Sequence, residues 1–217
     1  MRELTDTTPK SMLPVFNRPI LEYKLDALPE EIDEVILVVG YLGSLIQGHF
    51  GGEYKGKRIL YVEQEVPTGT ANALWEAKGI LKGVFVVMNG DDLYVTEDIR
   101  ACMEKPWAML VQERDPLGSG GKVVVDENGR IQEIQEGAHK GPGLLNTGLY
   151  VLDERIFSYT PVPKGVGESE FGLPQTMMTA VGDIVITAVP ATSWIQITAP
   201  EDLKKAEQIL EWGAEKK

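Results

Sequence analysis

Short apolar runs rich in valine and isoleucine recur along the chain and alternate with segments whose apolar residues follow helical spacing. Runs of this kind suit strands that are buried on both faces, as in parallel sheets. The alternation predicts the α/β class, with a mainly parallel sheet and helices on both of its faces. The predicted strands are Glu34–Val39, Arg58–Val62, Gly83–Met88, Ala108–Val111 and Asp183–Val189. The predicted helices are Ile20–Leu28, Gly43–Phe50, Thr70–Leu81 and Pro200–Trp212.

The pattern changes after residue 117. Two apolar segments within Gly121–Ile134 flank the dipeptide Asn128-Gly129, which favours tight hairpin turns. Leu144–Leu152 predicts a further strand. We therefore expect an antiparallel excursion that covers one edge of the parallel sheet. Because ligands of open α/β sheets bind beyond the carboxyl ends of the strands, we expect the functional residues in the loops there.

Length, hydropathy and charge limit the number of domains, the cellular location and the partners that the sequence predicts. The 217 residues suit one domain, residues 1–217, and no apolar run approaches the roughly 20 residues that cross a bilayer. The polar amino terminus has no apolar segment of a secretory signal, and the single cysteine, Cys102, cannot form an internal disulfide. These features predict a cytoplasmic protein. A net charge of -12 without a basic stripe argues against nucleic acid as a partner.

Two polar motifs are candidates for phosphate chemistry. The segment Asn89–Asp92 directly follows a predicted strand, and a carboxylate there could hold Mg²⁺ while substrate phosphates supply the other ligands. The alternative is a polar turn that ends the strand. Lys10 lies between Pro9 and Pro14, where its charge could meet phosphate oxygens. The alternative is an exposed lysine on a surface loop.

A third motif, Gln64–Leu74, runs from a strand through a Pro/Gly turn into a helix. Amides at the helix start could meet a base edge or a phosphate; the alternative is a plain turn with Thr68 or Thr70 as the cap.

The two histidines are too far apart to suggest a metal cluster, and Cys102 suits a packed thiol. The sequence contains no Walker A loop, no Gly-x-Ser-x-Gly elbow and no zinc-ligand spacing.

Taken in order, these motifs resemble those of the sugar-phosphate nucleotidylyltransferases, which join a sugar 1-phosphate to a nucleoside triphosphate and release pyrophosphate. The resemblance runs nearly end to end, and its strength comes from the motifs jointly rather than from any one of them. The matching stretches are Leu4–Val15, Asn17–Tyr23, Val38–Gly43, Gln64–Ala71, Asn89–Asp91, Asn146–Val151 and Trp194–Leu203.

The resemblance implies a Rossmann-like nucleotidyltransferase fold and a set of site residues. Lys10 matches a lysine that steadies the phosphates around the reacting phosphorus, and Asp91 matches a metal-binding aspartate, which implies Mg²⁺ as cofactor. Since the sugar phosphate attacks the α-phosphorus directly, catalysis would consist of positioning and charge neutralisation. Positions that match nucleotide contacts are Gln64, Gly69, Thr70 and Gly90, and positions that match sugar contacts are Gly121, Glu136 and Asn146.

Three departures from the family pattern stand out. The family begins with a buried strand and a Gly-rich loop that carries a catalytic arginine, and Met1 aligns after them, which predicts a misassigned start or a truncation. Gln196 replaces the second metal-binding aspartate, so we expect weaker Mg²⁺ binding, although the amide oxygen can still act as a ligand. Gly137 replaces a lysine that grips the sugar phosphate, and Lys140 is a candidate substitute.

These departures leave three interpretations open. The first is an Mg²⁺-dependent enzyme that uses UTP or dTTP and a hexose 1-phosphate, with activity impaired in this chain. The second is a non-catalytic relative that binds a nucleotide or nucleotide sugar as a regulatory subunit or sensor. The third is a folded remnant without a ligand. The oligomeric state stays open, although homo-oligomers are common in the family.

Overall fold

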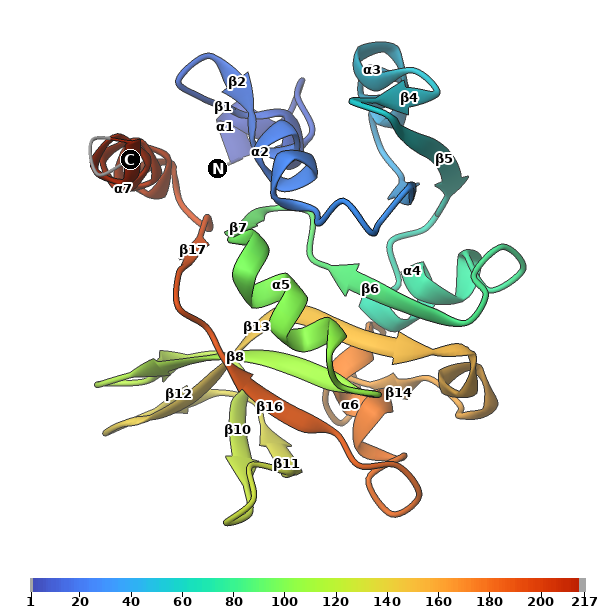
Figure 1. The fold of residues 1–217 in the computed structure, drawn as a ribbon, viewed down its shortest axis with the longest axis vertical. Helices are drawn as coiled ribbons and strands as arrows, with labels where there is room; N and C mark the ends of the chain where they lie inside the picture. Colours follow the sequence, from blue (N-terminus) through green and yellow to red (C-terminus); the bar gives the residue numbers. More distant parts are fainter. Residues whose placement is uncertain (1, 215–217) are drawn as a thin grey trace.

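The computed structural model describes residues 2–214, with side chains for residues 4–208 (Figure 1). The ends of the predicted domain, residues 1 and 215–217, lie outside the described part. The helices are α1 Arg2–Thr5, η1 Lys10–Met12, α2 Ile20–Ala27, α3 Gly43–Phe50, α4 Thr70–Glu76, α5 Thr96–Met103, η2 Glu154–Ser158, α6 Leu173–Met178 and α7 Pro200–Ala214. The longer strands are β3 Glu34–Val39, β5 Lys57–Glu63, β6 Val84–Met88, β8 Ala108–Arg114, β10 Lys122–Val125, β11 Ile131–Gln135, β13 Gly143–Asp153 and β16 Thr187–Pro190. The shorter strands are β1 Pro14–Val15, β2 Arg18–Pro19, β4 Glu53–Tyr54, β7 Asp92–Tyr94, β9 Gly118–Ser119, β12 Ala138–His139, β14 Val162–Pro163, β15 Phe171–Gly172 and β17 Trp194–Gln196.

The main sheet has six strands in the order β11-β10-β13-β8-β16, with β6 also paired to β13. Strands β6, β8 and β16 share one direction, but β13 runs antiparallel to β6, β8 and β10. The α/β class is confirmed, whereas the predicted predominance of parallel pairs is wrong. The reason is that the excursion through β10 and β11 returns β13 to the middle of the sheet, between β6 and β8, rather than leaving it at an edge.

Two predicted elements are shorter than their apolar patterns suggested. Strand β16 begins at Thr187 because the amides of Asp183 and Ile184 donate to the carbonyl of Ala180 in the turn after α6. Helix α4 ends at Glu76 because the following amides bond three residues back, as Lys78 does to the carbonyl of Trp75. A local turn satisfies the backbone at the start of the first apolar run and at the end of the second, so neither element extends over its whole run.

A second, three-stranded sheet has the order β3-β5-β4, with β3 and β5 parallel. Within residues 2–214, β3 pairs only with β5, and β6 pairs only with β13. No backbone ladder between described strands therefore joins the two sheets.

Both faces of the main sheet are covered by helices, as the sequence predicted. Alternate residues of β8 show this, since Ala108 and Leu110 belong to one core cluster while Met109 and Val111 belong to another. Helices α2, α3 and α5 contribute to the first cluster, and α4 and α6 contribute to the second. Figure 1 shows α5 and α6 on opposite sides of the sheet.

A third cluster joins distant parts of the chain. Leu13 and Val15, beside η1, pack with Leu93 of β7, Ile197 after β17 and Ala206 of α7. This cluster holds η1 beside β7 and thereby brings the segment that carries Lys10 to the end of β6. No helix within the described residues is long and apolar enough to cross a membrane.

Candidate active site

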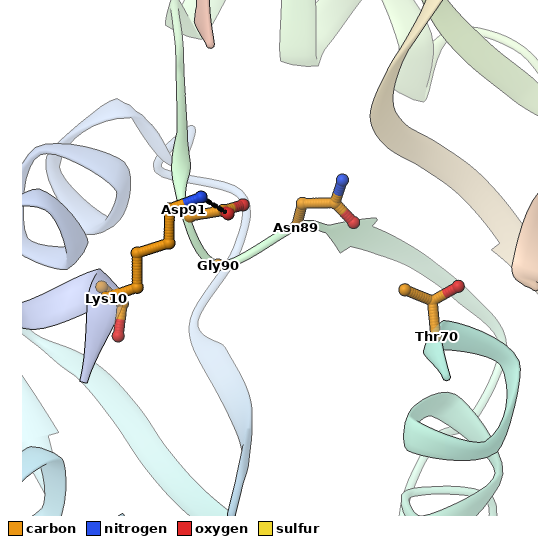
Figure 2. Close-up of a pocket in the computed structure, with 6 residues that line it drawn as sticks. Lys10, Thr70, Asn89, Gly90 and Asp91 are labelled. Atoms are coloured by element: carbon orange, nitrogen blue, oxygen red, sulfur yellow. Dashed lines mark hydrogen bonds and ion pairs between the residues drawn. The ribbon is translucent and has the colours of Figure 1, made fainter. Parts of the chain in front are cut away.

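Three segments meet around an open cavity of about 450 Å³: η1, the loop after β6 and the first turn of α4 (Figure 2). Each segment was singled out in the sequence as a separate motif. The cavity lies at the carboxyl end of β6, where open α/β sheets bind their ligands. Its lining residues are Lys10, Ser11, Thr70, Asn89, Gly90 and Asp91.

The Lys10 ammonium group forms an ion pair with the Asp91 carboxylate across 81 residues of sequence. Pro9 and Leu13 delimit the short η1 turn, in which the Leu13 amide donates to the Lys10 carbonyl at 3.1 Å. The Lys10 and Asp91 side chains are 29% and 33% exposed, so both charges remain accessible from the cavity. The pair therefore places one cation and one anion at the same point, where an incoming polyanion or a metal ion could separate them.

The position of Asn89 depends on a glycine of β13. The Asn89 amide donates to the Gly148 carbonyl at 2.9 Å, and this bond continues the ladder beyond β6. Gly148 has φ 81°, and a Cβ atom there would lie 2.0 Å from the Asn89 side-chain nitrogen. Only glycine fits that position, so the Asn146–Gly148 motif leaves room for the Asn89 side chain next to the cavity.

The structure does not bring Gln196 into the cavity lining. Gln196 on β17 pairs with Asp92 on β7, and the next amide, Ile197, donates to the Asp92 carboxylate at 3.3 Å. Asp92 is only 4% exposed, and burial together with the Asp91 charge raises the pKa of Asp92. Asp92 thus serves as an internal anchor for the strand that carries Gln196, whose role as a metal ligand stays a prediction.

The segment Gln64–Leu74, which the sequence predicts to bind a nucleotide, is folded against the segment of β15 and α6. The Leu173 amide donates to the Thr70 hydroxyl at 3.0 Å, and the Phe171 amide donates to the Thr68 carbonyl at 2.8 Å. Gln64 follows β5, outside the described lining of the cavity, and its side-chain nitrogen is buried without a hydrogen-bond partner. Buried amides of this kind normally have partners, so Gln64 is equipped to donate to a ligand.

Gly69 offers a direct test of this folding. It has φ 104°, and a Cβ atom would lie 2.3 Å from the carbonyl oxygen of Phe171. We expect Gly69→Ala to lower the free energy of unfolding by at least about 3 kcal/mol, because strain and overlap add at one position. Urea unfolding measures this. Gly79→Ala is the matched control, since a Cβ atom at Gly79 meets nothing within 4 Å. Equal stability of the two variants would contradict the geometry described here.

The three predicted sugar-site residues lie together beside the first half of β13, where Asn146 is two residues from Gly148. The Asn146 amide donates to the Gly121 carbonyl at 2.9 Å, and a Cβ atom on Gly121 would lie 3.1 Å from a Glu136 carboxylate oxygen. The Gly148 amide donates to the Asn146 side-chain oxygen at 3.0 Å. Because Gly148 also bonds to Asn89, a continuous set of contacts links the cavity with this cluster.

Sequence reasoning missed two residues near the site and undervalued a third. Gln175 on α6 donates to Glu136 at 2.8 Å, and nothing in its sequence context signals this contact. Asp92 was noted only as part of an acidic pair. Lys24 is buried on α2 beside the Asn89–Asp91 loop, and its position on the apolar stripe of that helix is a signal that could have revealed it.

The fold and the cavity define an α/β protein with paired acidic and basic groups beside a strand end, which is a suitable arrangement for phosphate chemistry. Residues 1–207 match the sequence profile of the family described as Nucleotidyl transferase. The chain belongs to this family. The resemblance to sugar-phosphate nucleotidylyltransferases is thereby confirmed, and several relatives carry names of that class.

The similarity to curated relatives extends over most of this chain. This chain is 30% identical over 223 aligned positions to the UTP–glucose-1-phosphate uridylyltransferase AglF of Haloferax volcanii, and the alignment covers 97% of this chain and 91% of AglF. It is 26% identical to the D-glycero-alpha-D-manno-heptose 1-phosphate guanylyltransferase of Aneurinibacillus thermoaerophilus, covering 97% and 93% of the two chains. It is 27% identical to the bifunctional protein GlmU of Methanocaldococcus jannaschii, covering 97% of this chain but only 51% of GlmU. The chain thus spans about half the length of the GlmU proteins that it matches.

The fold itself is shared with solved structures. A UDP-glucose pyrophosphorylase determined in complex with UDP-glucose superposes with a TM-score of 0.81 at 18% identity, covering 97% of this chain and 93% of that one. At this identity the likeness concerns the fold alone. It confirms the predicted Rossmann-like nucleotidyltransferase architecture.

Proposed function

We propose that this chain, acting as a single nucleotidyltransferase domain of residues 1–217, transfers a nucleotidyl group from a nucleoside triphosphate to a sugar 1-phosphate. The observation that carries the proposal is the Lys10–Asp91 ion pair in the open cavity beyond β6. Family membership supports the reaction class. A phosphate oxygen of the sugar phosphate forms a bond to the α-phosphorus, the bond to the β-phosphate oxygen breaks, and pyrophosphate leaves.

In this reaction the protein contributes position and charge rather than covalent chemistry. Lys10 would move from Asp91 to the phosphate oxygens and offset their negative charge. Thr70 and Gly90 border the same cavity and would hold the nucleotide close to these two residues. The cluster of Gly121, Glu136 and Asn146 would bind the sugar, with Gln175 fixing the Glu136 carboxylate through its 2.8 Å contact.

A divalent cation fits the site if Asp91 supplies its protein carboxylate and the substrate phosphates and water supply the other ligands. The described residues contain no group of three or more His, Cys, Asp or Glu side chains that could enclose a metal ion. Mg²⁺ commonly uses one or two carboxylates and completes its shell with substrate phosphates and water, and Asp91 is a partly exposed carboxylate placed for that role. Mg²⁺ held there would neutralise charge on the transferred phosphate.

The identity of the base belongs to the proposal. We expect UTP or dTTP, read by the unpartnered side-chain nitrogen of Gln64. The names of the relatives include both a uridylyltransferase and a guanylyltransferase, so GTP belongs in the same comparison. An alternative function, a non-catalytic protein that binds a nucleotide sugar, is favoured by one observation: the position of the second family carboxylate is occupied by the neutral Gln196.

The deciding experiment measures pyrophosphate release from UTP, dTTP or GTP with glucose 1-phosphate and Mg²⁺, with EDTA added in a control. Metal-dependent release with one triphosphate supports the enzyme. The same protein is then heated with each nucleotide and with UDP-glucose, because a ligand that binds the native state raises the melting temperature. Stabilisation without release supports the non-catalytic alternative, and the absence of both would contradict any nucleotide-binding function.

A further inference from the structure

A lysine is buried directly beneath the candidate metal-binding loop. Lys24 lies on α2 between Leu21 and Leu25, on the face that packs into the core, and it is only 4% exposed. Lysines seldom lie at such positions, because burying an ammonium group is unfavourable unless charges or acceptors compensate it. An interior lysine at this place therefore calls for an explanation in terms of what it contacts.

The contacts of Lys24 converge on the loop after β6. Its ammonium group donates to the backbone carbonyl of Asn89, and it lies 4.7 Å from the centre of the Tyr94 ring. Burial lowers the pKa of Lys24, while the carboxylates of Asp92 and Asp91 oppose that shift. The lysine thus supplies a positive charge within the field of both carboxylates and a direct hydrogen bond to the chain two residues before Asp91.

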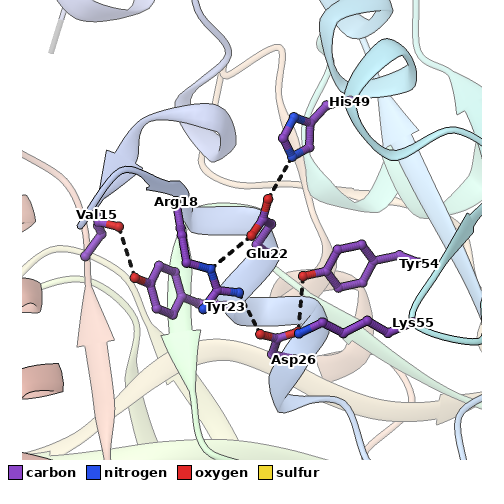
Figure 3. Close-up of polar contacts among 8 residues, drawn as sticks. All are labelled: Val15, Arg18, Glu22, Tyr23, Asp26, His49, Tyr54 and Lys55. Carbon is purple, nitrogen blue, oxygen red and sulfur yellow. Dashed lines mark hydrogen bonds and ion pairs between the residues drawn. The ribbon is translucent and has the colours of Figure 1, made fainter. Parts of the chain in front are cut away.

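The helix that carries Lys24 is itself tied to neighbouring elements on its other side (Figure 3). Glu22 accepts hydrogen bonds from Arg18 at 3.0 Å and pairs with His49 of α3 at 2.8 Å. Asp26 accepts hydrogen bonds from Arg18 at 2.7 Å and from Lys55 at 2.6 Å. These partly exposed ion pairs join α2 to α3 and the β4–β5 turn, whereas the position of Lys24 itself depends on the core packing of its neighbours Leu21 and Leu25.

We propose that Lys24 is a positioning residue: its buried ammonium group holds the Asn89 carbonyl and thereby orients the Asp91 carboxylate for a divalent cation. On one side the loop is tied to β13 through the Asn89 amide, and on the other side Lys24 ties the carbonyl of the same residue. The proposal rests on the proposed function, because it assigns a supporting residue to the same Asp91 site.

The test removes the ammonium group while keeping most of the side-chain volume. Lys24→Met is heated with UTP at increasing Mg²⁺ concentrations, and the midpoint of the stabilisation is compared with that of the unsubstituted protein. We expect the midpoint to rise by about 10-fold or more, the usual effect of losing a residue that orients a metal ligand. Lys24→Arg, which keeps a cationic donor, should recover part of the loss.

Lys57→Met is the matched control. The Lys57 ammonium also donates to backbone carbonyls, those of Pro29 at 2.8 Å and Ile32 at 2.5 Å, but it does so away from the cavity. This variant should lose stability without changing the Mg²⁺ midpoint. An unchanged midpoint in Lys24→Met, with the protein folded, would overturn the proposal.

Two further outcomes of this experiment need their own interpretation: a Lys24→Met variant that does not fold, and an unsubstituted protein that does not respond to Mg²⁺. If Lys24→Met does not fold, Lys24→Met/Asp92→Asn replaces both buried charges by neutral groups, and it is compared with Asp92→Asn alone. Failure of the double variant to fold would make Lys24 a purely structural residue and would overturn the proposal. If the unsubstituted protein shows no Mg²⁺-dependent stabilisation with any triphosphate, the proposed function itself fails, whatever the variants do.

Discussion

Asp91→Asn is expected to reduce metal-dependent pyrophosphate release by about 100-fold or more, the range seen when one preorganised electrostatic group is removed from a catalytic site. Asparagine keeps the size of the side chain, so the cavity should keep its shape. The substitution removes the Asp91 carboxylate, which both lines the cavity and forms the ion pair with Lys10. The effect should appear in the Mg²⁺ dependence as well as in kcat, because charge on the ligand strengthens cation binding.

Asp26→Asn is the matched control for this prediction. Asp26 is also a partly exposed aspartate in ion pairs, with Arg18 and Lys55, yet it lies in the network on the far side of α2. Its substitution should leave pyrophosphate release within about 2-fold of the unsubstituted chain, because exposed ion pairs contribute little to stability. Equal losses in the two variants would indicate a general loss of structure, and full activity of Asp91→Asn would exclude Asp91 as a metal ligand.

The local elements of the fold could be predicted from periodicity, whereas the order of strands could not. The prediction of α3 at Gly43–Phe50 is confirmed, because its apolar residues and its flanking turns agree. The placement of β13 depends on long-range pairing with β6 and β8, which no local pattern in Leu144–Leu152 records. A strand buried on both faces has the same apolar pattern whether its neighbours are parallel or antiparallel.

The same holds for the candidate site: local motifs identified single residues, but the contacts between those residues depend on packing between distant segments. Motif resemblance singled out Lys10 and Asp91 separately, but their ion pair depends on the packing of Leu13 against Leu93, which belong to segments about 80 residues apart. Lys24 was overlooked because a lysine in a helix is usually exposed. Its neighbours Leu21 and Leu25 place it on the buried face, so the helical period was the available signal.

Lys10→Met is expected to lower kcat by about 100-fold, while the Mg²⁺ dependence stays equal or shifts to lower concentrations. The physical reason is the position of the charge. In the structure the Lys10 ammonium pairs with Asp91, so removing it deletes the cation that would meet the phosphates and also frees the carboxylate for the metal. Asp91→Asn should instead weaken both turnover and metal binding, so the two partners of one ion pair should be distinguishable.

The control for Lys10 comes from the same surface network as the control for Asp91. Lys55 pairs with Asp26 at 2.6 Å, and Lys55→Met should leave turnover within about 2-fold of the unsubstituted protein. Combining Lys10→Met with Asp91→Asn completes a double-mutant cycle. If the two residues act in one site, the double variant should lose less activation free energy than the sum of the losses in the two single variants. Strictly additive losses would mean that Lys10 and Asp91 act independently, and a Lys10→Met variant with full kcat would remove Lys10 from the proposed reaction.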